Sequence, residues 1–150
     1  MKLKVLSLIE PWGTLIKDGK KHIETRSWKT NYRGDLYIHT SKQRINMSDA
    51  STGRINHLFQ KEDLQYGKIL CKYKLVDCVF MDDDFIESIS KNTQEHLCGL
   101  YEYGRYAWIL EDIEPVRPIS ARGSLRLWEF EIDNIILENN MTKSKIENAR

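Results

Sequence analysis

The run from Ile69 to Phe80 is the feature that most limits how this chain can fold, because its apolar pattern changes phase partway along. A strand turns alternate side chains to opposite faces, so a change of phase requires a β-bulge or a strong bend. We expect that bend near Leu75–Val76. A second run, Leu125–Ile132, changes phase in the same way. Two bent strands in one small domain predict a curved or closed sheet rather than a flat one.

The remaining apolar patterns are short, and few of them alternate as strand, helix and parallel strand. The sequence therefore predicts an α+β fold, a small and mostly antiparallel β-barrel with short helices packed between the strands. The further elements that we expect are strands at Lys4–Leu8, His22–Trp28, Asp35–Thr40 and Tyr106–Leu110, and helices at 11–19, 48–60 and 82–99.

The domain organisation follows from length and from a change in composition. A chain of 150 residues is long enough for one domain with a real core, but not comfortably for two. After about Asn134 the sequence turns polar, as "ENNMTKSKIENAR". We expect one domain over residues 1–133 and a frayed polar tail over residues 134–150.

Composition argues against several classes of protein. No apolar run approaches the roughly 20 residues that a helix needs to cross a bilayer. The start, "MKLKVLSLIEPW", is too soon charged for a signal peptide. The three cysteines, Cys71, Cys78 and Cys98, are odd in number and include no C-x-x-C pair, which argues against a disulfide framework and against a zinc site. We expect a cytoplasmic protein that needs no metal and no cofactor.

Positive charge is concentrated near the N-terminus, although the net charge of the whole chain is only +1. Residues 1–42 hold nine Lys or Arg and four Asp or Glu, whereas residues 43–150 hold fourteen and eighteen. A basic N-terminal region is suited to phosphate groups. A coincidental imbalance on the surface would give the same count.

The segment His22–Trp28 carries the strongest candidates for chemistry. Residues two apart in a strand share a face, so His22, Glu24, Arg26 and Trp28 point the same way. The next strand offers Tyr37, His39 and Ser41 on its polar face. If these two strands are neighbours across the turn "TNYRGD", we expect one polar patch that contains Lys21, Glu24, Arg26 and His39 between the rings of Trp28 and Tyr37.

Such a patch suits a planar, polar ligand. Aromatic rings stack on a base, Arg and Lys bind phosphate or carbonyl oxygen, and a carboxylate accepts from an exocyclic amine. A plainer interpretation is open for each group. Glu24 and Arg26 can form a simple ion pair, worth about 0–1 kcal/mol if exposed. Trp28 can belong to the core, to which we assign Trp12, Trp108 and Trp128, and His39 can be a hydrogen-bonded structural residue.

Several short motifs resemble one known family. Pro11–Trp12 is followed by G-x-K-x-x-E-x-R-S-W over Gly19–Trp28, then by Y-R-G over residues 32–34 and I-H at 38–39. Together with the later "YAWILED" and "ARGSLRLWEFE", they are similar to the ASCH family, the activating-signal-cointegrator homology domain of the PUA-like superfamily of small β-barrels. The resemblance covers roughly residues 4–133 and is most specific in the first half.

The resemblance implies a barrel with a cleft beside the first helix, lined by Lys21, Glu24 and Arg26. It also implies that the ligand is RNA, a nucleotide or a nucleoside. From the lack of a long apolar run we expect no membrane association, and a protein partner from the translation or transcription machinery is left open. The residues that we expect to bind the ligand are Lys21, Glu24, Arg26, Trp28, Arg33, Tyr37 and His39.

Enzymatic alternatives remain open at this point. One branch of the family hydrolyses the amide of acetylated cytidine with a Lys, a Thr and a distant Glu. Lys21 matches the Lys, but Glu24 occupies the position of the Thr, so a hydrolase of this kind would have to use Lys21 and Glu24 as an acid/base pair. A metal-independent ribonuclease with His39 as its catalytic residue is a further alternative. A protein-interaction adaptor with an unused cleft is the non-enzymatic one.

Overall fold

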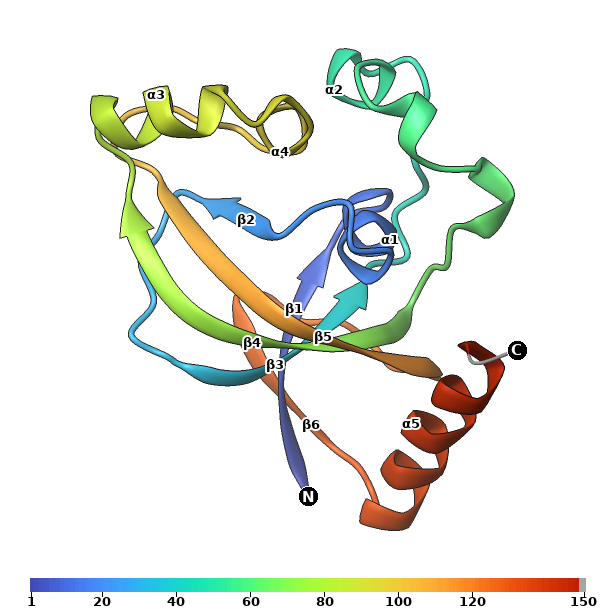
Figure 1. Ribbon diagram of the computed structural model, residues 1–150. Coiled ribbons are helices and arrows are strands. Elements are labelled where there is room, and N and C mark those ends of the chain that lie inside the picture. Colours follow the sequence, from blue (N-terminus) through green and yellow to red (C-terminus); the bar gives the residue numbers. More distant parts are fainter. Residues whose placement is uncertain (149–150) are drawn as a thin grey trace.

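The computed structural model describes residues 1–148, in which six strands form one mixed sheet in the order β2-β5-β4-β3-β1-β6 (Figure 1). Strands β1 and β3 are parallel, and the other paired strands are antiparallel. The sheet is strongly curved and forms a half-barrel, which confirms the predicted α+β, mostly antiparallel fold. The strands are β1 (Lys2–Leu8), β2 (Ile23–Arg26), β3 (Gly34–Thr40), β4 (Lys68–Phe80), β5 (Tyr106–Ser120) and β6 (Leu127–Glu131).

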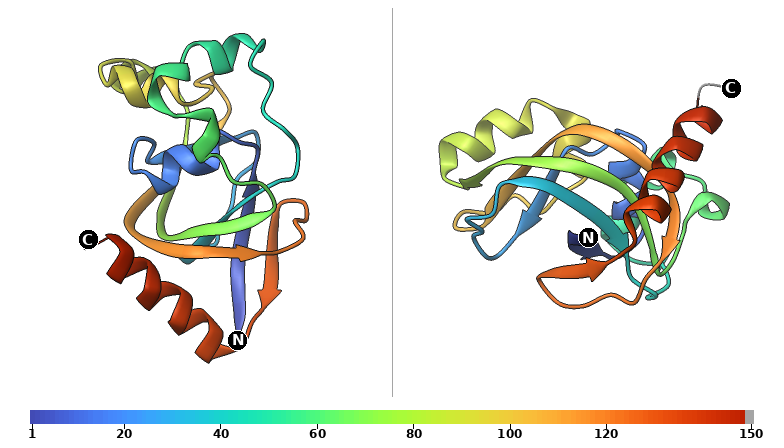
Figure 2. Two further views of the ribbon diagram at one scale, coloured as in Figure 1. Left: turned by 90° about the vertical axis from the view of Figure 1, so that its right-hand side faces the viewer. Right: turned by 90° about the horizontal axis from the view of Figure 1, so that it is seen from below.

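Strand β4 bends where the sequence predicts it. Its register with β5 shifts between Leu75 and Asp77, and again at two earlier points of the strand. Figure 2 shows the resulting curvature of β4 and β5. The second predicted bend is wrong, because β6 begins only at Leu127. Arg126, just before it, has a φ of 57°, and Leu125 is 89% exposed, so the change of phase comes from a loop rather than from a bent strand.

Helices occupy the predicted regions but are shorter than expected. The first begins after Pro11, and Gly19 follows its end with a φ of 73°. Residues 82–99 form two helices, because Asn92 interrupts the first and its side chain caps the second. Asp49 and Asp82 cap their helices as expected for acidic residues at such positions. The helical elements are α1 (Trp12–Lys17), α2 (Ala50–Gly53), the 3-10 turns η1 (Asn56–Leu58) and η2 (Lys61–Asp63), α3 (Asp83–Ser90), α4 (Thr93–Leu97) and α5 (Asn134–Asn148).

The polar C-terminal stretch is a helix rather than a frayed tail. Helix α5 lies against the convex side of the sheet, near β5 (Figure 1). Leu137 is buried there beside Val5 and Val116, and Met141 packs against the same cluster. Leu137 and Met141 are four residues apart, so they lie on one side of the helix and attach it to the sheet. The division of the chain at residue 133 stays a prediction, and residues 149–150 lie outside the described part.

The expectation that β2 and β3 are neighbours is wrong. Strand β3 is paired on both edges, with β1 and with β4, so it has no free edge for β2. Strand β2 pairs instead with β5, where Glu24 lies opposite Trp108 and Arg26 opposite Tyr106. The polar faces of β2 and β3 therefore do not join through a shared ladder.

Candidate functional site

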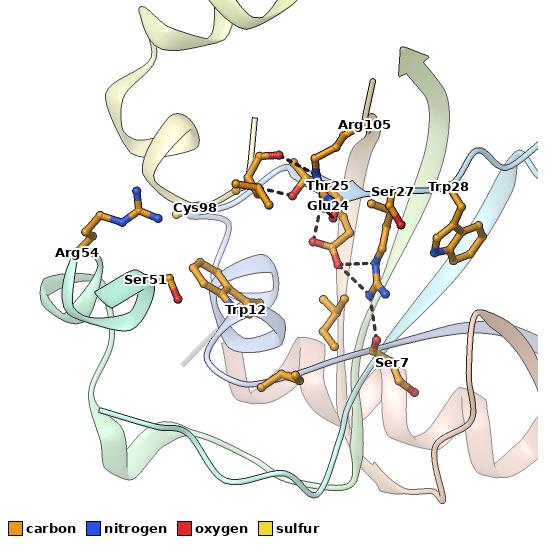
Figure 3. Close-up of a pocket in the computed structure, with 15 residues that line it drawn as sticks. Ser7, Trp12, Glu24, Thr25, Ser27, Trp28, Ser51, Arg54, Cys98 and Arg105 are labelled. Atoms are coloured by element: carbon orange, nitrogen blue, oxygen red, sulfur yellow. Dashed lines mark hydrogen bonds and ion pairs between the residues drawn. The ribbon is translucent and has the colours of Figure 1, made fainter. Parts of the chain in front are cut away.

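A cleft of about 560 Å³ lies between β2, the start of α1, α2 and the segment that follows α4. Figure 3 shows Arg54 and Ser51 at one end of this cleft and Trp28 at the other, with Trp12 and Glu24 between them. Its walls thus come from segments that are far apart in the sequence. The residues that line it and matter below are Ser7, Trp12, Glu24, Arg26, Trp28, Arg54, Cys98 and Arg105.

Lys21 lies behind the wall of the cleft rather than in it. Its side chain is 1% exposed, and its ammonium group donates to the backbone oxygens of Ile23, at 2.6 Å, and of Cys98. The same Nζ atom is 3.6 Å from Oε1 of Glu24. The Lys21 ammonium group is thus paired with protein groups, as a buried charge must be because it has lost its contact with water.

Glu24 connects Lys21 to the cleft. Glu24 is 7% exposed, and its Oε1 accepts a hydrogen bond from the backbone N–H of Thr25 at 3.2 Å. Oε2 accepts from Nε of Arg26 at 3.1 Å and lies 3.0 Å from Nη2 of the same guanidinium group. Both carboxylate oxygens are therefore engaged with protein groups, and we expect Glu24 to orient Arg26 rather than to accept from a ligand amine.

Arg26 presents part of its guanidinium group to the cleft. Nη2 donates to the backbone oxygen of Ser7 at 3.0 Å, which links the edge strand β2 to β1 across the opening of the half-barrel. Among the described residues, Nη1 of Arg26 has no hydrogen-bond partner. The group is therefore fixed on one side and free to donate on the other.

Two further arginines, which sequence reasoning missed, line the same cleft. Arg105 donates through Nε to the backbone oxygen of Leu100 at 3.2 Å and through Nη2 to that of Thr25 at 3.4 Å. Arg54 is exposed, and within residues 1–148 its guanidinium group has neither a hydrogen bond nor an ion pair. Three guanidinium groups thus border a cleft in which Glu24 is the one lining carboxylate of the described residues.

Two tryptophans form the aromatic part of the wall. Trp12, which we assigned to the core, is half-buried and both packs on the core and lines the cleft. Trp28 meets Trp108 edge to face, with ring centroids 4.8 Å apart, so its ring is anchored on the core. The guanidinium carbon of Arg126 lies 4.8 Å from the centroid of the Trp28 ring. The cleft therefore combines flat apolar surfaces with cations.

Helix α1 is held tightly, which fixes Trp12. The buried carboxylate of Glu10 accepts the backbone N–H of Thr14 at 2.8 Å, the Thr14 hydroxyl, and the backbone N–H of Gln65 at 3.0 Å. Burial raises the pKa of Glu10, and these hydrogen bonds oppose that shift. Gly13 lies so close to Thr40 that a Cβ atom there would be 2.5 Å from the Thr40 methyl carbon.

The cleft thiol is poorly suited to nucleophilic attack. Cys98 is 1% exposed, and burial raises the pKa of its thiol, although the nearby Lys21 ammonium opposes the shift. The thiol is therefore protonated at neutral pH, whereas the thiolate is the reactive form. The three cysteines are free thiols.

The other predicted binding residues lie away from the cleft. Arg33 donates to the backbone oxygens of Thr30 and Tyr32 and lies 3.6 Å from a carboxylate oxygen of Asp77. Tyr37 is 4% exposed and belongs to the apolar cluster under α5, where burial raises its pKa. Neither residue is brought together with Glu24 and Arg26.

His39 is a buried structural link. Its Nε2 donates to the backbone oxygen of Ala121 at 2.8 Å, because a carbonyl oxygen can only accept. Nδ1 is then the acceptor and takes the hydroxyl hydrogen of Ser7 at 2.9 Å, while Trp128 Nε1 donates to the same hydroxyl. Burial lowers the pKa of His39, which agrees with a neutral ring.

Two kinds of feature are absent from the described part of the chain. Within residues 1–148, no group of three His, Cys, Asp or Glu side chains is arranged to hold a metal ion. No helix in this part is both long and apolar enough to span a lipid bilayer.

Comparison with known proteins identifies relatives of this fold and sequence. The model of the ASCH domain matches residues 6–121. Activating signal cointegrator 1 from Mus musculus is 25% identical over 131 residues, which cover 84% of this chain and 22% of that protein. Activating signal cointegrator 1 from Homo sapiens is 30% identical over 81 residues, covering 49% of this chain and 14% of that protein. The chain thus spans less than a quarter of the length of these relatives.

A solved structure supports the same fold. The crystal structure of ASCH from Zymomonas mobilis superposes with a TM-score of 0.55 over 96% of this chain and 93% of that one, at 16% sequence identity. At this level of identity the likeness concerns the fold alone.

Proposed function

The chain belongs to the ASCH domain family, and from that premise we propose that its cleft binds RNA or a nucleotide. The observation that carries the proposal is the meeting of Arg26, Arg54 and Arg105 with two tryptophan rings in one cleft. Guanidinium groups bind phosphate through directed N–H donors, and aromatic rings stack on bases regardless of sequence. The family resemblance points to RNA as the ligand class.

The contacts support different roles for Arg26, Glu24 and Lys21. Arg26 has free donors toward the cleft and is a direct ligand for phosphate or a base edge. Glu24 holds Arg26 in place, and Lys21 compensates the charge of Glu24 from behind the wall. Arg54 and Arg105 supply further cationic contacts from other segments.

The enzymatic alternatives have less support from these contacts. A base must reach the reacting group, yet the Lys21 ammonium is enclosed by two backbone oxygens and by Glu24. A ribonuclease would need an accessible His39. Both ring nitrogens of His39 are engaged in hydrogen bonds, and His39 is only 1% exposed. A cytoplasmic location and a protein partner from the translation or transcription machinery stay predictions.

Titration of a fluorescent single-stranded RNA at several salt concentrations tests the proposal. Binding through phosphate contacts weakens as salt rises, with a log–log slope of about −0.7 for each contact to a single strand. We expect Arg26→Ala and Arg54→Ala each to weaken binding and to reduce the slope by about one contact.

Arg117→Ala is the matched control, because Arg117 is exposed on β5 and does not line the cleft. It should leave both affinity and slope close to those of the wild type. Wild-type binding that is insensitive to salt, or equal losses in all three variants, would contradict a phosphate-binding cleft.

A further inference from the structure

A row of aromatic side chains leads out of the cleft across the sheet. Arg26 on β2 lies opposite Tyr106 on β5, and Tyr106 lies opposite Phe80 on β4. Residues directly opposite one another in antiparallel strands share a face of the sheet. With strands about 4.8 Å apart, Phe80 is only about 10 Å from Arg26 along this row.

A third ring completes the row through a turn. Tyr103 lies in the turn before β5, and the Gly104 N–H of this turn donates to the backbone oxygen of Met81, just after β4, at 3.0 Å. This places the Tyr103 ring edge to face against Phe80, with centroids 5.4 Å apart. Phe80 meets Tyr106 in the same manner at 5.7 Å. The three rings therefore form one connected cluster.

The outer two rings of this cluster are exposed to an unusual degree. Phe80 is 43% exposed and Tyr103 is 67% exposed. Soluble proteins rarely leave large apolar side chains exposed next to one another, and such a patch marks a binding surface. Arg26 and Phe80 share a face of the sheet, so a strand bound at Arg26 has only β5 to cross before it reaches the cluster.

The charged residues beside the three rings favour a nucleic acid strand whose phosphates lie at the cleft end of the row. Arg26 and Arg105 lie at its cleft end, and Arg105 directly precedes Tyr106 in the chain. At the other end, Asp83, Asp84 and Glu102 are exposed and repel phosphate. A strand whose phosphates contact the arginines has its next base beside Phe80 and Tyr103.

We infer that the ligand is a single strand of RNA rather than a free nucleotide, with one base in the cleft and a following base stacked on the Phe80–Tyr103 pair. This inference rests on the proposed function of the cleft. Stacking on such rings tolerates any base, since every base has a π-face. The surface therefore predicts length dependence without a strong sequence preference.

Binding of uridine monophosphate and of oligouridylates of two, four and eight nucleotides to the full chain tests the inference. We expect affinity to rise with length, and Phe80→Ala and Tyr103→Ala each to weaken octamer binding about fivefold or more, which is the usual effect of losing one stacking ring. Both variants should bind the monophosphate like the wild type. Phe80→Trp should retain octamer binding, whereas Phe80→Leu, which keeps apolar bulk without a π-face, should not.

Ile135→Ala is the matched control, because Ile135 is 68% exposed on α5, on the other side of the sheet. Urea midpoints of all variants establish that they are folded.

If the wild type binds neither monophosphate nor octamer, the proposed function itself fails. If both bind in an Arg26-dependent manner but Phe80→Ala leaves the octamer unchanged, the cleft function stands and this inference is overturned, leaving the rings to a protein partner. Equal weakening of monophosphate and octamer in Phe80→Ala would also overturn it.

Discussion

Glu24 holds Arg26 at two points, since its Oε2 accepts a hydrogen bond from Nε at 3.1 Å and lies 3.0 Å from Nη2. A guanidinium group fixed in this way loses little freedom when it binds a phosphate, so it is organised before the ligand arrives. The carboxylate nevertheless reduces the positive charge of the cleft. Its orienting effect and its electrostatic effect on an anion have opposite signs, so the direction in which a single substitution changes affinity shows which effect is larger.

Glu24→Ala should weaken RNA binding even though it makes the cleft more positive. If charge alone decided affinity, removing a carboxylate would tighten the complex. We expect about tenfold weaker binding, equivalent to about 1.4 kcal/mol, because Arg26 loses a charge-assisted hydrogen bond that fixes it. Fluorescence anisotropy with a labelled single strand measures the change. Tighter binding by the variant would show that Glu24 acts only as a repelling charge. Glu114→Ala, which removes a carboxylate on β5 paired with Lys72, is the control.

Lys21→Met should act on folding stability more than on the ligand. The substitution leaves the Glu24 carboxylate and two backbone oxygens without their buried partner. Removing one member of a buried ion pair costs about 3 kcal/mol or more. We expect a lower urea midpoint with an unchanged m-value, measured by circular dichroism.

Lys74→Met is the comparison for this effect. Lys74 is 55% exposed, and its Nζ lies 4.0 Å from Asp112, so its loss should change stability by less than about 1 kcal/mol. The salt slope of RNA binding by the Lys21 variant gives a second readout. A slope reduced by one full contact would indicate that the Lys21 ammonium touches phosphate, contrary to its enclosed position.

The bend of β4 illustrates what the sequence encodes locally. The alternation of Ile69–Leu75 marks the buried face of the strand, and its change at Val76 coincides with a register shift in the structure. The caps at Asp49 and Asp82 are equally local, because the side chain bonds to a backbone N–H two or three residues along. Features of this kind can be predicted from neighbouring residues alone.

The partner of β2 is not encoded in this way. The short connection from β2 to β3 resembles a hairpin turn, yet β2 pairs with β5, about 80 residues further along the chain. Pairing depends on which strand edges the rest of the sheet leaves free, and no local pattern contains that information. For the same reason, nothing near Arg54 or Arg105 in the sequence indicates that they meet Arg26. The Glu24–Arg26 pair was predictable because two residues two apart share a face of one strand.

Acidification should destabilise the fold through His39. Burial lowers its pKa in the folded state below the ordinary value of 6.5, so between these two values the unfolded chain binds more protons than the folded one. Stability is therefore complete above about pH 6.5 and is lost as the pH falls through the folded-state pKa. Urea midpoints between pH 7 and pH 5 measure the loss. The slope should be smaller in His39→Gln, and a variant that keeps the wild-type slope would contradict this role of His39.

Gly13→Ala should destabilise the protein and disturb the cleft together. A Cβ atom at residue 13 would lie 2.5 Å from Cγ2 of Thr40, whose residue is fully buried and cannot easily move. Helix α1 must then shift away from β3, and Trp12 on the first turn of that helix shifts with it. Overpacking of this kind costs about 1–3 kcal/mol.

Gly53→Ala is the matched substitution, because nothing lies within 4 Å of the added atom. We expect this variant to lose no stability, or to gain about 0.4–1 kcal/mol because its unfolded chain is stiffer. Chemical denaturation gives both stabilities, and RNA titration of the folded Gly13 variant reports on Trp12. Equal stability of the two variants would contradict a close contact between α1 and β3, and unchanged RNA affinity would contradict a role for Trp12 in the cleft.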